Sequence, residues 1–158
     1  MNEEIKYHLA NSIDTEAVVE ILKQFSDESN GIQTLEVNQK LHELRMEYFK
    51  EQLDKNYICW YATFNGEMAS IAGMILRDQP PTIKNLSGKW GYIFGVYTKI
   101  EYRRKGLSKN ILQRLMNTAI ERGVTAFELH STKEGEIVYN KEGFELYNEP
   151  TYRKIISV

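Results

Sequence analysis

The sequence predicts one α/β (α+β) domain over residues 1–158, with a mixed, mostly antiparallel sheet of about seven strands, a central parallel pair and about four flanking helices. Three observations support this. The chain of 158 residues has the size of one ordinary domain. Short strand-like runs alternate with amphipathic helical patterns. Between residues 90 and 130 a strand, a helix and a second strand follow one another, an order that implies a right-handed crossover and parallel pairing.

The N-terminal part predicts a strand and two helices. Ile5 to Leu9 reads as a short strand, and Asp14 is a residue type that caps helix N-termini. A helix is therefore expected from Asp14 to about Asp27, and a second from about Leu35 to Leu53. Each has an apolar face at helical spacing, formed by Val18, Ile21, Leu22 and Phe25 in the first helix and by Val37, Leu41, Leu44 and Tyr48 in the second.

A hairpin and a glycine-interrupted strand are expected next. The strand-like runs 57–64 and 67–76 are separated by Asn65-Gly66, a pair that tolerates positive φ at both turn positions. After the loop 78–88, the run 90–98 is rich in aromatic and β-branched residues, which favour a strand. Gly91 and Gly95 interrupt it. Glycine inside a strand indicates a bulge or a close backbone approach.

The C-terminal part predicts two more helices and three more strands. A helix is expected from about Leu107 to Arg122, and a short one over 134–141 that ends at Gly143. The expected strands are Thr125 to His130, Phe144 to Tyr147 and Tyr152 to Val158. The last two complete the predicted sheet of seven strands.

Composition narrows the classes of function. Twenty basic and 22 acidic side chains give a formal net charge of −2, which predicts no general attraction to nucleic acid or to an anionic membrane. Cys59 is the one cysteine, so no internal disulfide is expected, and no leader or run of 18 apolar residues predicts export or a membrane span. We therefore expect a cytoplasmic protein. No spacing of histidine, cysteine and carboxylate residues predicts a metal site.

Three adjacent cations, Arg103, Arg104 and Lys105, precede Gly106 at the start of a predicted helix. A cation near the positive end of a helix costs about 0.3–1 kcal/mol, and a bound anion reverses the sign of that contribution. Glycine and free backbone N–H groups at a helix N-terminus form a phosphate cradle. The loop therefore predicts a phosphate-binding site, although an isolated basic loop is more often simply solvated.

Two motifs in this context resemble the GNAT superfamily of acyl-CoA-dependent N-acyltransferases. The family's pyrophosphate loop reads Gln/Arg-x-x-Gly-x-Gly/Ala, and Arg103, Gly106 and Ser108 stand at its three defined places, with serine as the small final residue. A second signature, Tyr-x-x-x-Gly-Phe, is present from Tyr139 to Phe144. Each motif alone is weak. Together, in the order strand, loop, helix, strand and short helix, they identify the chain as similar to this family.

The resemblance implies a site for acetyl-CoA as co-substrate. In the family, the pantetheine arm enters a gap beside the central strand and hydrogen-bonds like a missing strand. The backbone N–H of Val96 matches the donor to the thioester oxygen, a contact that strengthens in the transition state. The positions that match the cofactor site are Val96, Tyr97, Thr98, Arg103, Arg104, Lys105, Gly106, Leu107, Ser108 and Lys109.

The resemblance also implies direct attack of an amine on the acetyl group, with CoA leaving as a thiolate. Tyr139 matches the general acid that protonates this sulfur. A tyrosine of pKa about 10 stays protonated at neutral pH, whereas a thiol of pKa about 8.5 leaves as an anion that accepts the proton. The acceptor is expected to be a primary amine of a small molecule or peptide. Tyr92 and His130 are candidates for binding it, and no general base is assigned.

Departures from the family pattern leave alternatives open. Thr132 and Gly135 replace an asparagine and an alanine that relatives often carry, and Tyr92 stands where some relatives place a glutamate base. A relative that binds acyl-CoA as a sensor or structural module without transfer is therefore the second hypothesis. A nucleotide-binding or nucleic-acid-binding protein is the third, disfavoured because no Lys-Ser P-loop ending follows the loop. The resemblance also allows a homodimer paired through residues 151–158.

Overall fold

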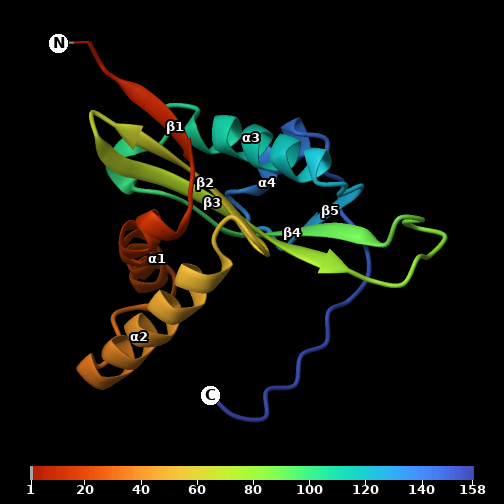
Figure 1. Ribbon diagram of the computed structural model, residues 1–158, viewed down its shortest axis with the longest axis horizontal. Helices are drawn as coiled ribbons and strands as arrows, with labels where there is room; N and C mark the ends of the chain where they lie inside the picture. The colour runs from red at the N-terminus through yellow and green to blue at the C-terminus, as the bar shows by residue number, and fades with distance from the viewer. Residues whose placement is uncertain (1) are drawn as a thin grey trace.

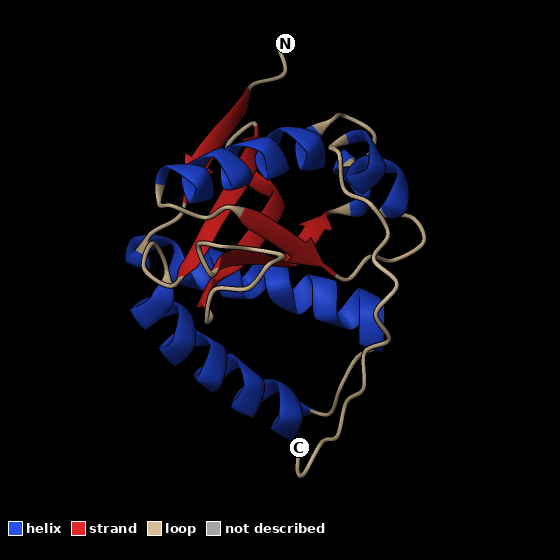
Figure 2. Ribbon diagram, turned by 90° about the vertical axis from the view of Figure 1, so that its right-hand side faces the viewer, coloured by secondary structure: helices blue, strands red, loops and turns tan. Residues whose placement is uncertain are grey.

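The computed structural model describes residues 2–158, in which one five-stranded sheet lies between two layers of helices (Figures 1 and 2). The strands lie side by side in the order of the sequence. Pairing is antiparallel from β1 to β4 and parallel between β4 and β5, so the predicted parallel pair is confirmed, but it lies at one edge of the sheet and not at its centre, because β5 is the last strand. The strands are β1 (Ile5–Leu9), β2 (Tyr57–Phe64), β3 (Glu67–Asp78), β4 (Lys89–Thr98) and β5 (Ala126–Leu129).

Four α-helices cover the sheet within the described residues. They are α1 (Thr15–Asn30), α2 (Leu35–Gln52), α3 (Leu107–Glu121) and α4 (Glu136–Lys141). Two 3₁₀ turns, Ser12–Asp14 and Ile100–Tyr102, precede α1 and α3. Figure 2 shows α3 and α4 on one face of the sheet and α1 and α2 on the other. Among residues 2–158, no helix combines the length and the apolar character needed to span a bilayer.

Each face of the sheet has its own hydrophobic core. On the α3 face, Ile111, Leu112 and Leu115 pack fully buried against β2 and β3. On the α1 face, Val18 and Ile21 pack against a second set of strand residues. Burying a side chain of this size contributes about 1.5–3 kcal/mol. These two cores hold β4 between them.

The hairpin prediction is confirmed, and the capping prediction is wrong in one detail. Asn65 and Gly66 have φ of 49° and 85°, as a tight turn between antiparallel strands requires. Asp14 stands at the N-terminus of α1, but its side chain makes no cap hydrogen bond to that helix. Its carboxylate instead accepts from the Asn11 backbone N–H at 2.9 Å and from the Tyr61 hydroxyl at 3.0 Å. Asp14 thus belongs to the capping box of the preceding 3₁₀ turn and contacts β2, and it does not cap α1.

The predicted apolar face of α2 is not buried. Val37, Leu44 and Tyr48 are 48%, 50% and 41% exposed, although their spacing predicted a core face. The helix contacts the sheet through its C-terminal end, where Phe49 is buried and packs edge-on against Tyr57 at 5.1 Å. Figure 1 shows the rest of α2 extending away from the strands. A helix that reaches the sheet through one end leaves most of its apolar stripe outside the core.

The prediction of seven strands is wrong, because residues 144–158 form no strand. This segment leaves α4 and runs along the outside of the molecule (Figure 1). Its apolar side chains remain exposed, including Leu146 at 87%, Tyr152 at 93% and Ile156 at 84%. Alternating apolar residues predict a strand, but a strand needs a neighbouring backbone with which to pair. Pro150, which lacks a backbone N–H, also interrupts the segment.

Candidate active site

Strand β4 has a bulge at Gly95. Tyr97 pairs with Ile71 and Phe94 with Gly73, so β4 holds one more residue than β3 across this interval. Gly95 has φ of +76°, the left-handed conformation that a glycine bulge uses. Gly91 serves close packing instead, because a Cβ there would overlap Met74 and lie 2.9 Å from the Cδ1 atom of Phe127. The bulge predicted from glycine in the strand is thus present at one of the two glycines.

Strands β4 and β5 separate just before this bulge. Their parallel pairing begins at Trp90 with Ala126 and ends at Ile93 with Leu129. Strand β4 continues to Thr98, and within residues 2–158 no strand pairs with this last part on the β5 side. The backbone around Val96 is therefore open to an extended ligand that hydrogen-bonds like a strand.

Three hydroxyl groups tie the end of β4 to the start of α3. The Ser70 and Thr98 hydroxyl oxygens lie 2.6 Å apart, and those of Thr98 and Ser108 lie 2.8 Å apart. The side chain of Leu107, next to Ser108, is buried in the α3 core. These contacts hold the first turn of α3 against the edge of the opening.

Arg103 braces the loop between β4 and α3. Its Nε atom donates to the Thr98 carbonyl oxygen at 2.9 Å, and its guanidinium pairs with Glu28 at 2.6 Å. Glu28 also accepts a hydrogen bond from the Tyr97 hydroxyl at 2.9 Å. The bond from Arg103, followed by the bond from Tyr97, lowers the pKa of Glu28. The guanidinium thus faces α1 and the backbone.

The next residues of this loop present free backbone amides. Arg104 and Gly106 both have left-handed φ, at +63° and +74°. The N–H groups of residues 104–109 donate no hydrogen bond to any atom of residues 2–158, and Gly106 gives α3 no side-chain cap. Amides arranged in this way form an anion-binding concavity at the positive end of a helix. The loop therefore fits the diphosphate of a nucleotide-containing ligand.

The charged side chains of this loop point in different directions. Lys105 lies toward β1 and β2, with its Nζ atom 3.6 Å from the Glu3 carboxylate and 5.0 Å from the centre of the Phe64 ring. Arg103 thus contacts Glu28 and the Thr98 carbonyl, Lys105 lies over the neighbouring strands, and Arg104 and Lys109 are exposed to solvent.

Tyr139 lies on α4, half-buried among residues of the α3 core. Its ring is edge-on to Phe144 at 6.0 Å. Burial raises the pKa of Tyr139, and the hydroxyl makes no hydrogen bond with residues 2–158. A Cβ on Gly135 would lie 2.9 Å from the Cε2 atom of the Tyr139 ring. The glycine that departs from the family pattern therefore leaves room for this ring.

Tyr92 and His130 belong to an aromatic cluster on the other face of β4. The rings of Tyr92 and Phe94 stack at 6.3 Å, and His130 lies edge-on to Tyr92 at 5.8 Å. The Arg77 guanidinium lies 4.1 Å from the centre of the Tyr92 ring. Phe94 is 52% exposed. No sequence motif singled out Phe94 or Arg77, although alternation along β4 places Phe94 on the same face as Tyr92.

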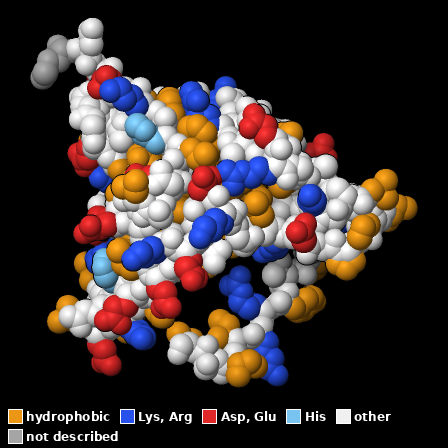
Figure 3. Space-filling model, in the orientation of Figure 1, with side chains coloured by type: hydrophobic (Ala, Val, Ile, Leu, Met, Phe, Trp, Pro, Cys, Tyr) orange, Lys and Arg blue, Asp and Glu red, His pale blue; other side chains and the backbone are white. Residues whose placement is uncertain are grey.

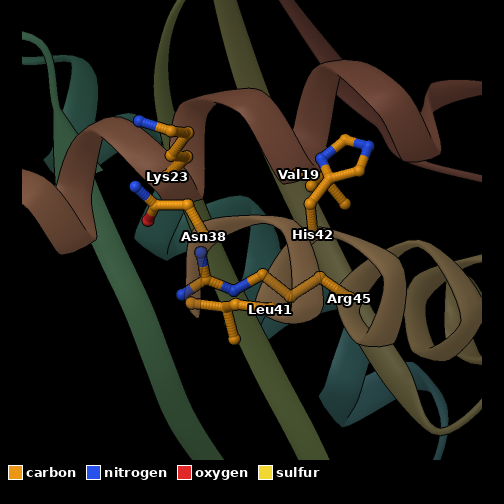
Figure 4. Close-up of a pocket in the computed structure, with 6 residues that line it drawn as sticks. All are labelled: Val19, Lys23, Asn38, Leu41, His42 and Arg45. Carbon is orange, nitrogen blue, oxygen red and sulfur yellow. The ribbon is translucent and has the colours of Figure 1, made fainter. Parts of the chain in front are cut away.

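Figure 3 shows an opening between the body of the molecule and the C-terminal segment. A separate cavity lies between α1 and α2 (Figure 4), with a volume of about 10 Å³. That volume holds about one water molecule, so this cavity is no site for a large ligand. Its lining residues are Val19, Lys23, Asn38, Leu41, His42 and Arg45.

Cys59 is fully buried, and burial raises the pKa of its thiol, so it is a packing residue of β2. Within residues 2–158, no three histidine, cysteine or carboxylate side chains gather as metal ligands would.

Known proteins with similar sequences and folds can now be compared. The model of the acetyltransferase (GNAT) family matches residues 17–144. A predicted acetyltransferase from Clostridium acetobutylicum, solved with acetyl-CoA, is 28% identical, with 96% of each chain covered and a TM-score of 0.82. The comparison with curated proteins finds no match.

Two more distant structures share the fold. Glucosamine-6-phosphate N-acetyltransferase from Arabidopsis thaliana is 19% identical, with 98% of this chain and 99% of that chain covered and a TM-score of 0.71. An aminoglycoside acetyltransferase from an uncultured soil metagenomic sample is 14% identical, with 98% and 99% covered and a TM-score of 0.76. Proteins with different named acceptors thus share this architecture.

Proposed function

Since the chain belongs to the acetyltransferase (GNAT) family, we propose that residues 1–158 act as one domain that transfers an acetyl group from acetyl-CoA to a primary amine of a small molecule or peptide. The enzyme is an acyltransferase. Two features at one end of β4 together support the proposed acetyl transfer. The strand edge around Val96 is unpaired, and the free amides of residues 104–109 follow it directly.

Acetyl-CoA would bind along this edge and end at the amide cradle. The backbone of Val96, Tyr97 and Thr98 would hydrogen-bond the pantetheine arm, as an added strand does. The amides of residues 104–109 would hold the diphosphate, with Arg104 and Lys109 adding positive charge at the mouth. Arg103 would stabilise the conformation of the loop and not contact the diphosphate itself, since its side chain already contacts Glu28 and the Thr98 carbonyl.

The chemistry needs a donor to the thioester oxygen and an acid for the leaving sulfur. The amine nitrogen attacks the acetyl carbon and releases a proton to solvent, the carbon–sulfur bond breaks, and CoA leaves as a thiolate that accepts a proton. The Val96 N–H at the bulge would stabilise negative charge on the carbonyl oxygen. Tyr139 would supply the proton, which suits a hydroxyl whose pKa is raised by burial and whose proton is not committed to another residue.

The aromatic cluster indicates the class of acceptor. Phe94 stands two residues before Val96 and is half exposed. It lies on the same face of β4 as Tyr92, whose ring stacks beside it. Glu128 is paired in register with Tyr92 and provides one carboxylate beside these aromatic rings. A polycationic acceptor would require several carboxylates, whereas aromatic rings favour apolar groups and single cations. We therefore propose an amine attached to an aromatic or apolar group.

Replacing Phe94 by alanine tests this acceptor surface. We expect the KM for 2-phenylethylamine to rise about five- to tenfold, because a half-exposed ring contributes part of the free energy of a buried one. The Kd of acetyl-CoA, measured by calorimetry, should not change. Ile13→Ala is the matched control, since Ile13 is an apolar side chain 90% exposed outside the proposed site. An unchanged KM in Phe94→Ala would exclude this surface from acceptor binding.

Release of free thiol from acetyl-CoA tests the proposed function itself. The purified protein is mixed with 2-phenylethylamine, a polyamine, an amino sugar or a peptide with a free N-terminus. We expect release with at least one amine and the largest kcat/KM for the aromatic one. A protein that binds acyl-CoA without transfer would release no thiol above background, and preferential use of the amino sugar would contradict the proposed acceptor class alone.

The exposed C-terminal segment supports a homodimer. Tyr152, Ile155 and Ile156 are 93%, 65% and 84% exposed, and apolar surface of this kind is typical of interaction sites. A second copy with the same segment is the proposed partner. Sedimentation equilibrium at micromolar concentration should give the mass of a dimer, and the mass of one chain would contradict this proposal.

A further inference from the structure

Tyr57 connects the α2 face of the molecule to the bulge in β4. It is the first residue of β2 and is fully buried. Its hydroxyl donates to the Phe94 carbonyl oxygen at 3.2 Å. Burial raises the pKa of Tyr57 well above its ordinary value, so the hydroxyl remains a donor. A buried tyrosine thus bonds the backbone one residue before the bulge.

Two glycines make room for this hydroxyl. A Cβ on Gly73 of β3 would overlap the Tyr57 hydroxyl and ring, so no larger residue fits there with Tyr57 in place. A Cβ on Gly95 of β4 would lie 3.2 Å from the same hydroxyl oxygen. The side chain therefore starts on β2, crosses β3 at Gly73 and ends against the bulge. Three strands meet at a single hydroxyl group.

The bond restricts the peptide that leads into the bulge. A bulge leaves its extra residue outside the regular hydrogen-bond ladder, and glycine allows a wide range of backbone angles. Rotation about the Gly95 backbone would turn the next peptide, which carries the Val96 N–H. The Tyr57 hydroxyl opposes that rotation because it holds the Phe94 carbonyl oxygen and contacts Gly95.

We propose that Tyr57 is a positioning residue for acetyl transfer, which holds the Phe94 carbonyl and thereby directs the Val96 N–H toward the thioester oxygen. This inference rests on the proposed function, in which Val96 stabilises the developing negative charge. Tyr57 does not touch the substrates in this scheme. An N–H donor that is already oriented needs no free energy of reorganisation during the reaction. A small displacement of the donor therefore lowers the rate strongly.

Tyr61 provides a matched control on the same strand. It lies on the same face of β2, and its hydroxyl also makes one side-chain hydrogen bond, to Asp14 at 3.0 Å. That bond joins β2 to the start of α1 and involves no residue of the bulge. Tyr57→Phe and Tyr61→Phe each remove one hydroxyl and keep the ring, so both should lower the Tm by a few degrees.

The two variants are compared by kinetics and by calorimetry. In Tyr57→Phe we expect kcat to fall about tenfold or more with the Kd of acetyl-CoA within about threefold of the original protein, because the diphosphate contacts remain. Tyr61→Phe should keep the original kcat at temperatures well below its Tm. The proposal is overturned if the kcat of Tyr57→Phe lies within about twofold of that of Tyr61→Phe, because the activation free energies of the two variants would then be nearly equal.

Amide hydrogen exchange gives a readout that needs no turnover. Peptides that cover residues 94–98 should exchange faster in Tyr57→Phe than in Tyr61→Phe, because the bulge opens more often. Equal exchange in the two variants overturns the proposal even if kcat falls. If the original protein releases no thiol with any amine, the proposed function fails, and the exchange comparison still decides whether Tyr57 holds the bulge.

Discussion

Tyr139→Phe should lower kcat by about 10²- to 10³-fold, the range expected when a general acid is removed. The variant retains the ring that packs against Phe144 and loses the one proton that the leaving thiolate would accept. The Kd of acetyl-CoA should change little, because the hydroxyl is not part of the amide cradle. Stopped-flow or steady-state thiol release gives kcat, and calorimetry gives the Kd.

The control for this prediction is Tyr7→Phe. Tyr7 is also half-buried, on β1, with the Arg114 guanidinium 4.5 Å from its ring centre. It lies outside the proposed site, so its kcat should be unchanged. A loss of kcat in Tyr139→Phe accompanied by an equal loss of acetyl-CoA affinity would contradict the acid role and favour a packing role.

The pH dependence of the original enzyme should agree with the same role. An acid donates only while it is protonated, so its contribution is lost as pH rises through its pKa. Burial raises the pKa of Tyr139 above its ordinary value. Deprotonation of Tyr139 should therefore not limit kcat below a pH of about 10. A limb near pH 8 in kcat that disappears in Tyr139→Phe would contradict this assignment.

Gly106→Ala should raise the Kd of acetyl-CoA about tenfold while leaving kcat at saturation nearly unchanged. Gly106 has φ of +74° at the N-terminus of α3, and a side chain in the left-handed region costs about 1–2 kcal/mol. The loop of the variant would relax toward another conformation, and binding would have to restore the cradle. That cost corresponds to about a tenfold change in Kd, which calorimetry measures directly.

Gly66→Ala controls for backbone strain alone. Gly66 has φ of +85°, and a Cβ there would meet no atom within 4 Å, so the added methyl group is strained but does not clash. It lies in the β2–β3 turn, away from the proposed site. Both variants should lower the Tm, and only Gly106→Ala should weaken acetyl-CoA binding. Equal Kd values in the two variants would exclude the amides of residues 104–109 from diphosphate binding.

Local signals in the sequence predicted the elements that depend on neighbouring residues. Asn65 and Gly66 predicted a turn because both adopt positive φ at low cost. Glycine in an aromatic strand predicted the bulge at Gly95. The run from Arg103 to Ser108 predicted an anion cradle, because unpaired amides at a helix start follow from local backbone geometry. The residues that cause each of these features are neighbours in the chain, so a short stretch of sequence is enough to predict the feature.

Features that join distant parts of the chain required the tertiary structure. Arg103 looked like a ligand of phosphate, yet it pairs with Glu28, 75 residues earlier in the chain. The apolar stripe of α2 is exposed because the helix contacts the sheet through Phe49. The alternating residues after Gly143 predicted strands, but they have no paired neighbour.

By itself, the sequence determined the family, the order of the elements up to α4, the parallel pairing of β4 with β5 and the position of the loop that follows β4. The tertiary structure decided the number of strands, the exposed face around Phe94 and the contact of Tyr57 with the bulge. The physical reason is the range of the interactions. Turns, bulges and helix starts depend on the backbone preferences of a few adjacent residues, whereas strand pairing, burial and the Tyr57 bond depend on which distant segments meet.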